Sequence, residues 1–225
     1  MHQVRIALFV FTTALLVGCE TTSTGGTIGG LFPAPKFLKG KIENGIYIAQ
    51  DKSFSVSIPH SIGSYEYTHM QVKEQYSDHG TYVSFGPSAF DQRIYRVQIY
   101  GNDIIKRVMP DIQSTRFDVV AAKVFEGYKA QLLKVYGTMP KEVLSLQETI
   151  NGRKGLYWRL TQEINNSNNN AYLANSNTDI YLAHDIYIVN FEKGIALVGV
   201  QTHRPAPPLA GIMDPRAFAE SVVMY

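Results

Sequence analysis

The stretch EVLSLQETINGRKGLYWRLTQE, residues 142–163, decides the fold. Two runs of strand-forming composition, Glu142 to Ile150 and Arg153 to Glu163, flank the pair Asn151-Gly152. Both residues of this pair tolerate a positive φ, so the pair favours a two-residue hairpin turn. The second run alternates between two faces, with Leu156, Trp158 and Leu160 on one and Tyr157, Arg159 and Thr161 on the other. This pattern predicts a long antiparallel β-hairpin.

A long helix is predicted immediately before this hairpin. Thr115 can cap it, and Asp118 three residues later completes a capping box. Gly137 ends the helix. One face carries apolar side chains at helical spacing: Phe117, Val120, Ala121, Val124, Phe125, Tyr128, Leu132 and Val135. We expect Phe125, at the centre of this face, to pack on the same core as Trp158.

Several shorter strands are predicted before the helix. Residues 54–58, Phe-Ser-Val-Ser-Ile, alternate cleanly, which places the serines outside and the apolar side chains inside. The side chains of residues 93–100 also alternate between two faces of the expected strand. Tyr95, Val97 and Ile99 share one face, and Arg96 and Gln98 share the other. The remaining expected strands lie around Ile46 and Ile48 and at residues 67–76 and 81–85.

The C-terminal part predicts a loop, a second hairpin and a helix. Residues 165–179 are rich in asparagine and predict a long polar loop, and residues 180–191 and 195–203 predict a hairpin around a polar turn. Asp214-Pro215 then opens a terminal helix whose apolar stripe is Phe218, Val222 and Tyr225. The order strands, helix, strands, helix indicates an α+β domain over residues 36–225, an antiparallel β-sheet flanked by helices.

These pieces resemble the PsbP-like sandwich superfamily over roughly residues 44–225. The resemblance rests on Gly45-Ile-Tyr-Ile, on Phe54-Ser-Val-Ser-Ile-Pro, on the central helix and on the two hairpins, the second of which leads towards Phe218-Ala-Glu-Ser-Val-Val. The sequence departs from the family pattern in residues 61–92, a long region rich in tyrosine and histidine. The resemblance implies an α/β/α sandwich that docks on larger assemblies without enzymatic activity.

The first residues indicate export. Arg5 is followed by an apolar run over residues 6–15 and then by Leu16-Val17-Gly18-Cys19. The run is too short to span a membrane, and the whole pattern is typical of a removable signal. It resembles the lipobox of bacterial lipoproteins, which implies cleavage before Cys19 and acyl chains on that residue. An ordinary secretory signal is the alternative interpretation.

The resemblance to lipoproteins also implies a location. Two or more acyl chains anchor a protein stably, whereas one does so marginally. Residue 20 is Glu and not the aspartate that retains enterobacterial lipoproteins at the inner membrane. The resemblance therefore implies an anchor in the outer membrane of a Gram-negative bacterium, with the protein facing the periplasm.

Composition divides the chain and limits its partners. Residues 1–18 are the expected signal peptide. Residues 19–35 are rich in threonine and glycine, so we expect them to form a flexible tether. Cys19 is the only cysteine, so no intramolecular disulfide can form. The chain has 21 basic and 19 acidic residues. Removal of residues 1–18, in which Arg5 is the one charged residue, leaves 20 basic and 19 acidic residues, a net charge of +1. This balance argues against nucleic-acid binding.

Metal-binding and catalytic signatures are weak. Imidazoles at His60, His69 and His79, with Asp78 beside the last, are of the kind that binds zinc, but their spacing matches no compact motif. There is no Gly-x-Ser-x-Gly elbow. We therefore expect no metal, no cofactor and no enzymatic activity.

Two other catalytic arrangements have only weak support in the sequence. Ser84 or Ser88 could be nucleophiles served by His184-Asp185, but adjacent residues on a strand point to opposite faces. Acidic residues could supply paired carboxylates for glycan cleavage, yet acidic residues are expected on solvent-facing strand positions in any case. The three acidic residues concerned are Glu142, Glu148 and Glu163.

Candidate partner-binding residues are aromatic or proline. The chain has 14 tyrosines, and tyrosine is favoured in interfaces, although strands also favour it. The expected contacts are Tyr65, Tyr67, Tyr76 and Tyr82. A rigid extended segment with Pro205, Pro207 and Pro208 is a secondary contact or merely a stiff connection.

The sequence as a whole predicts a lipid-anchored, non-enzymatic interaction module. Its expected partners are the membrane, through lipid on Cys19, and proteins of an envelope assembly such as a secretion apparatus. A periplasmic lipoprotein that binds a small ligand or metal is one alternative, and a cell-wall or lipid hydrolase is another.

Overall fold

The computed structural model describes residues 40–59, 72–77, 80–86, 93–109, 116–163, 181–204 and 213–225. The predictions for the signal, Cys19, the tether, residues 61–71 and the loop 165–179 lie outside these residues. The elements in chain order are β1 (Lys41–Glu43), β2 (Ile46–Ile48), β3 (Phe54–Ser57), β4 (Val72–Ser77), β5 (Gly80–Phe85), β6 (Ile94–Gly101), α1 (Asn102–Val108), α2 (Phe117–Tyr136), β7 (Lys141–Ile150), β8 (Arg153–Glu163), β9 (Tyr181–Phe191), β10 (Gly194–Arg204), α3 (Pro215–Glu220) and β11 (Val223–Met224).

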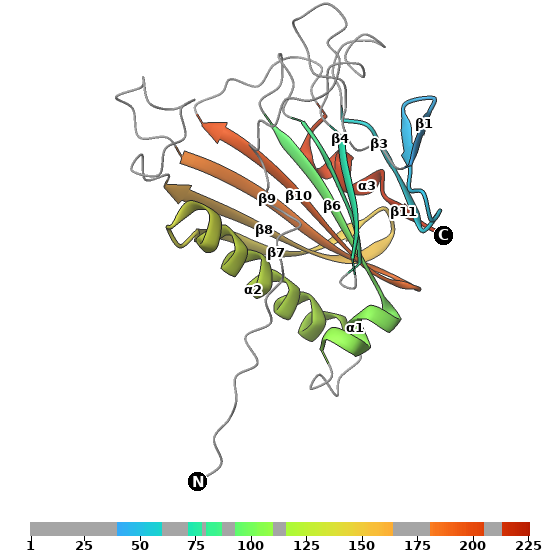
Figure 1. The fold of residues 1–225 in the computed structure, drawn as a ribbon. Coiled ribbons are helices and arrows are strands. Elements are labelled where there is room, and N and C mark those ends of the chain that lie inside the picture. Colours follow the sequence, from blue (N-terminus) through green and yellow to red (C-terminus); the bar gives the residue numbers. More distant parts are fainter. Residues whose placement is uncertain are drawn as a thin grey trace, which may run out of the picture.

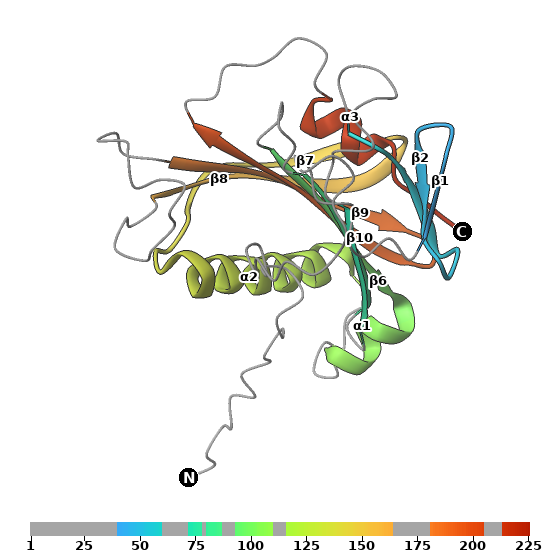
Figure 2. The ribbon, with the colours of Figure 1, turned by 45° about the horizontal axis from the view of Figure 1, so that its top comes forward.

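The fold is mixed α+β and consists mostly of antiparallel sheet. Seven strands form one sheet in the order β4-β5-β6-β10-β9-β8-β7, and four short strands form a second in the order β1-β2-β3-β11. Helix α2 runs along one face of the seven-stranded sheet (Figure 1). Helix α3 and the small sheet lie on the other face (Figure 2). The seven-stranded sheet is therefore covered on both sides.

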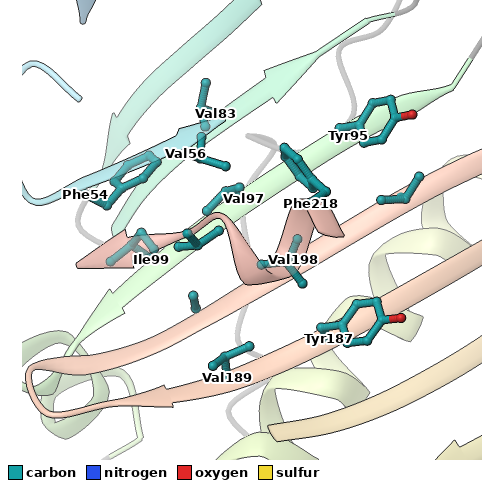
Figure 3. Packing of buried hydrophobic residues seen from close by; sticks show 14 of the residues in the cluster. Phe54, Val56, Val83, Tyr95, Val97, Ile99, Tyr187, Val189, Val198 and Phe218 are labelled. Atoms are coloured by element: carbon teal, nitrogen blue, oxygen red, sulfur yellow. The ribbon is translucent and has the colours of Figure 1, made fainter. Parts of the chain in front are cut away.

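Two apolar clusters hold these layers together. One joins the seven-stranded sheet to the small sheet and α3; Figure 3 shows Phe54 and Val56 of β3 and Phe218 of α3 directed into the same cluster as Val97 and Val198. The other joins α2 to the opposite face and contains Phe125, Trp158, Ile186 and Leu197. Since successive strand residues point to opposite faces, both sets of alternating side chains in the sheet are used for packing.

The predicted turns and helix ends are confirmed where they depend on local chemistry. Asn151 and Gly152 have φ values of 47° and 75°, as a two-residue hairpin turn with both residues at positive φ requires. Gly137 ends α2 in the left-handed conformation, with φ 72°. Asp214 caps α3, because its Oδ1 accepts hydrogen bonds from the backbone N–H groups of Arg216 at 2.9 Å and Ala217 at 3.0 Å.

The capping box predicted for α2 is wrong. Its N-cap is Arg116, which makes no side-chain capping hydrogen bond, and Asp118 instead binds the guanidinium of Arg116. Thr115 lies outside the described residues. Val135, predicted on the apolar face, is also exposed.

The chain end also differs from the prediction. The helix stops at Glu220, and β11 follows and pairs with β3. Ser55, expected outside, is therefore buried at 4 % exposure, and its Oγ lies 2.8 Å from the hydroxyl of Tyr225. Phe218 and Val222 are buried as predicted, whereas Tyr225 is exposed.

Candidate functional site

The outer edge of strand β7 carries several exposed apolar side chains. Within the seven-stranded sheet β7 pairs only with β8, and its residues from Lys141 to Gln147 are all exposed. Three large apolar side chains lie there, with exposed fractions of 59 % for Val143, 39 % for Leu144 and 43 % for Leu146, and Met139, two residues before the strand, is 60 % exposed. We call these four residues the β7 patch.

Part of this edge is protected against pairing and part is not. The register between β7 and β8 shifts between Glu142 and Leu144, so Val143 occupies a bulge. Bulges and charged side chains both discourage edge strands from pairing with other chains, and Lys141 and Glu142 add charge at this end. Residues 144–147, Leu-Ser-Leu-Gln, carry neither feature, and among the described residues no other strand pairs with this length of edge.

Polar side chains border the β7 patch on one face. Leu144 is opposite Arg159 and Leu146 is opposite Tyr157 on β8, so these four side chains share a face. Both β8 residues bind Asp185 of β9: the Tyr157 hydroxyl donates to Oδ1 at 2.6 Å, and Arg159 Nε donates to the same oxygen at 2.8 Å. Burial, and next the hydrogen bond to Asp185, raise the pKa of Tyr157. Asp185 therefore fixes a half-exposed guanidinium beside the patch.

A second polar group lies buried between α2 and the sheet. Arg96 of β6 is 4 % exposed and Gln201 of β10 is 2 % exposed. Arg96 Nη1 donates to Gln201 Oε1 at 2.9 Å, and the hydroxyl of Tyr136 on α2 lies 3.1 Å from the same oxygen. Burial works against the charged form of Arg96, but charge interactions with the hydroxyls of Tyr82, Tyr128 and Tyr136 outweigh it and raise the pKa of the guanidinium. The site thus holds a permanent positive charge away from water.

Aromatic rings surround this buried charge. His184, opposite Gln201 in the pairing of β9 with β10, is fully buried. Its ring makes an edge contact with Tyr128, at a centroid distance of 6.4 Å and an angle of 79°. Gly199 is opposite Arg96 and has no side chain to hold α2 away, so the Tyr128 hydroxyl lies close above it, 3.4 Å from where a Cβ would be. The glycine lets α2 bring this hydroxyl down beside the guanidinium.

The structure separates the catalytic residues that the sequence offered. His184 contacts Tyr128 on the α2 side, while Asp185 binds Tyr157 and Arg159, so the two do not act as base and orienter. Ser84 lies on β5, and β6 and β10 stand between it and β9. Three strand spacings amount to about 14 Å, which is too far for a hydrogen bond to His184. Ser88 lies outside the described residues.

The acidic residues considered for glycan cleavage have structural partners. Glu148 lies 3.5 Å from Arg216, and Glu163 lies 3.6 Å from Lys141. Glu142 is exposed at the start of β7. His60, His69, His79 and Asp78 lie outside the described residues, and the described residues contain no group of three or more possible metal ligands.

The predicted partner-binding residues are placed only in part. Tyr82 lies in β5 at 2 % exposure, within the Arg96 group and not on the surface. Tyr76 lies in β4, which pairs with β5. Tyr65, Tyr67, Pro205, Pro207 and Pro208 lie outside the described residues and remain predictions. Neither the β7 patch nor the role of Arg96 was predicted from the sequence. The apolar residues Val143, Leu144 and Leu146, close together in one strand, were the available signal for the patch.

Comparisons with known proteins add no relative. No protein-family model matches the chain, and no curated protein matches it. No helix among the described residues combines the length and the apolar character that crossing a membrane requires. The fold alone therefore defines the class of protein: a mixed α+β protein built on an antiparallel sheet that is covered on both faces. Its function is proposed below.

Proposed function

We propose that this chain is a lipid-anchored, non-enzymatic interaction module of the bacterial cell envelope, a subunit or accessory of an assembly such as a secretion apparatus. The observation that supports this proposal is the β7 patch. An exposed apolar edge of this kind marks a site for another chain. Its half-exposed neighbour Arg159 provides a polar rim, as interfaces commonly have.

The proposed mode of binding is addition of a strand. An extended segment of an envelope protein pairs with the outer edge of β7 at residues 144–147, where the backbone supplies hydrogen bonds and alternate side chains supply specificity. Leu144 and Leu146 lie on one face of this edge, next to Tyr157 and Arg159. Completing the burial of each leucine contributes roughly 1 kcal/mol, since full burial of such a side chain is worth about 1.5–3 kcal/mol.

The anchor in this proposal is lipid on Cys19, in the outer membrane and facing the periplasm. A chain of the length of residues 19–35 reaches at most about 60 Å when fully extended, enough for the domain to meet proteins embedded in the same membrane. The finer assignment of the fold to the PsbP-like sandwich superfamily belongs to the same proposal. It is supported by the order of short strands, long helix, two hairpins and terminal helix.

Tyr65, Tyr67 and Tyr76, with the segment from Pro205 to Pro208, form a second contact region in this proposal. A second candidate function is the binding of a small ligand, which the buried charge of Arg96 favours.

The experiment compares two variants with added charge in the full-length lipidated protein. Leu144→Lys combined with Leu146→Lys should abolish co-purification of envelope proteins, because two buried charges would oppose the added strand. Leu133→Lys on α2 is the matched control, since Leu133 is 38 % exposed and lies outside the patch. If the double variant keeps its partners with unchanged thermal stability, β7 is not the interface.

A further inference from the structure

Arg96 is a buried cation that has no counter-charge among the residues that the structure describes. It forms no ion pair with a carboxylate among the described residues, and its Nε has no hydrogen-bond acceptor among them. Its hydrogen-bond partners are neutral groups: Nη1 donates to the amide oxygen of Gln201, and the guanidinium also hydrogen-bonds with the hydroxyl of Tyr82. A guanidinium does not lose its proton in proteins, and a buried charge is costly unless a charge or several hydrogen bonds offset it. Among the described residues, the Nε without an acceptor and the lack of a carboxylate leave this guanidinium able to bind an anion.

We propose that Arg96 is the anchor of a binding site for a small carboxylate, in which the carboxylate takes the place that the Gln201 amide now holds. The amide oxygen marks that place. Two donors already converge on it, Arg96 Nη1 at 2.9 Å and the Tyr136 hydroxyl at 3.1 Å. The side chain of Gln201 swings aside, and the incoming oxygens receive these hydrogen bonds together with one from Arg96 Nε.

The chemistry of the site favours a monoanionic carboxylate over phosphate. A guanidinium matches the planar, two-oxygen geometry of a carboxylate. The described groups near Arg96 include the phenols of Tyr82, Tyr128 and Tyr136, Ser84 opposite it on β5 and the ring of His184 next to Tyr128. None of these is a second lysine or arginine, so one negative charge balances the site, whereas a phosphate dianion would leave excess charge in a dry environment.

The surroundings strengthen this recognition. The other residues of the α2 cluster are apolar and buried, including Leu132, Leu160 and Ile186. Water is excluded there, so a charge-assisted hydrogen bond is stronger than it would be at the surface. The site lies on the α2 face of the sheet and the β7 patch borders the opposite face, so carboxylate binding goes beyond the interaction proposed for the patch and can fail independently of it.

The test measures thermal unfolding of the purified full-length protein against acetate, with chloride replacing it at constant ionic strength and phosphate as a second probe. Acetate should raise the Tm of the wild type saturably, because a ligand that binds only the folded state stabilises it. Arg96→Met should remove this response. Gln201→Glu places a carboxylate where the proposal puts one, so it should raise the Tm without acetate and also remove the response.

The matched control is Gln162→Glu. Gln162 is equally buried, but its Nε2 donates to the carbonyl oxygens of Leu132 and Thr138, so a carboxylate there should lower the Tm. The proposal is overturned if acetate fails to stabilise the wild type, if phosphate stabilises it instead, or if Gln201→Glu lowers the Tm as Gln162→Glu does. Should Arg96→Met fail to fold, the wild type and Gln201→Glu decide the question alone.

Discussion

The rings of Phe125 and Trp158 stack face to face, with centroids 4.2 Å apart and planes inclined by 13°. Phe125 lies in the middle of α2 and Trp158 in the middle of β8, so this pair joins the long helix to the sheet. The sequence predicted that these two residues share one core, and the structure confirms it.

Replacing either ring by alanine should lower the free energy of unfolding by about 3–5 kcal/mol, through lost burial and the cavity left behind. Thermal or urea melts of the full-length protein measure this. Leu133→Ala on the exposed side of α2 is the control and should change stability by less than about 0.5 kcal/mol. Equal melts for Phe125→Ala and the control would show that α2 is not docked on β8.

Substitution of Cys19 tests the anchor. Cys19→Ala removes the only thiol and hence the proposed lipid, so the protein should move from the detergent phase to the aqueous phase in a phase-partitioning experiment. Cys19→Ser, which retains the size but cannot form the thioether, should behave in the same way. Full retention of either variant in membranes would contradict the proposed lipoprotein.

Local chemistry made part of this fold predictable. Asn151-Gly152 forms its hairpin turn, and Asp214 caps its helix, through contacts with residues next to them in the chain. The helix over residues 117–136 was predictable because its apolar residues recur at helical spacing on one face. Sequence reasoning failed where the partner is distant in the chain. Ser55 is buried because the chain end returns to pair with β3, 170 residues further on.

The candidate sites were harder to predict for the same reason. Arg96 alternates with apolar residues as a solvent-facing strand residue would, yet α2 covers it and Gln201, 105 residues away, accepts its hydrogen bond. The β7 patch depends on which strand ends up at the sheet edge, which is a property of topology and not of the strand's own residues. Helix α1, by contrast, is short and lacks a side-chain cap, so its local signals are limited to Asp103 in the first turn and Lys106 and Arg107 in the last.

Helix capping offers a paired test of the two predicted caps. Asp214→Ala removes an acceptor of two backbone N–H groups and should cost about 1 kcal/mol. Asp118→Ala, at the predicted but absent capping box of α2, removes only an exposed ion pair with Arg116 and should cost less. Urea melts that give the reverse order would contradict the assignment of these two helix ends.

Alkaline pH should destabilise the protein through its buried phenols. Burial raises the pKa of Tyr100, Tyr128, Tyr157 and Tyr187 above the usual value. The unfolded chain releases these protons near pH 10, while the folded chain keeps them. The stabilisation is therefore complete below about pH 10 and is lost as the pH rises towards the folded pKa values, at up to about 1.4 kcal/mol per pH unit for each tyrosine.

Urea melts between about pH 8 and about pH 11 measure this loss. Tyr100→Phe keeps the ring and removes one titrating proton, so its stability should fall less steeply with pH than that of the wild type. Identical slopes would mean that Tyr100 ionises as readily in the folded state as in the unfolded chain.

Site-specific photo-crosslinking in living cells tests the central proposal, that β7 is where this module meets its partner. A photoreactive residue at Leu146 should yield a discrete crosslinked product with an envelope protein, and one at Leu133, on the exposed side of α2 with nearly the same exposure, should not. Loss of the Leu146 product on adding Leu144→Lys would tie it to strand addition. The same product from both positions, or a product from Tyr65 or Tyr67 and none from Leu146, would contradict the account and move the interface away from β7.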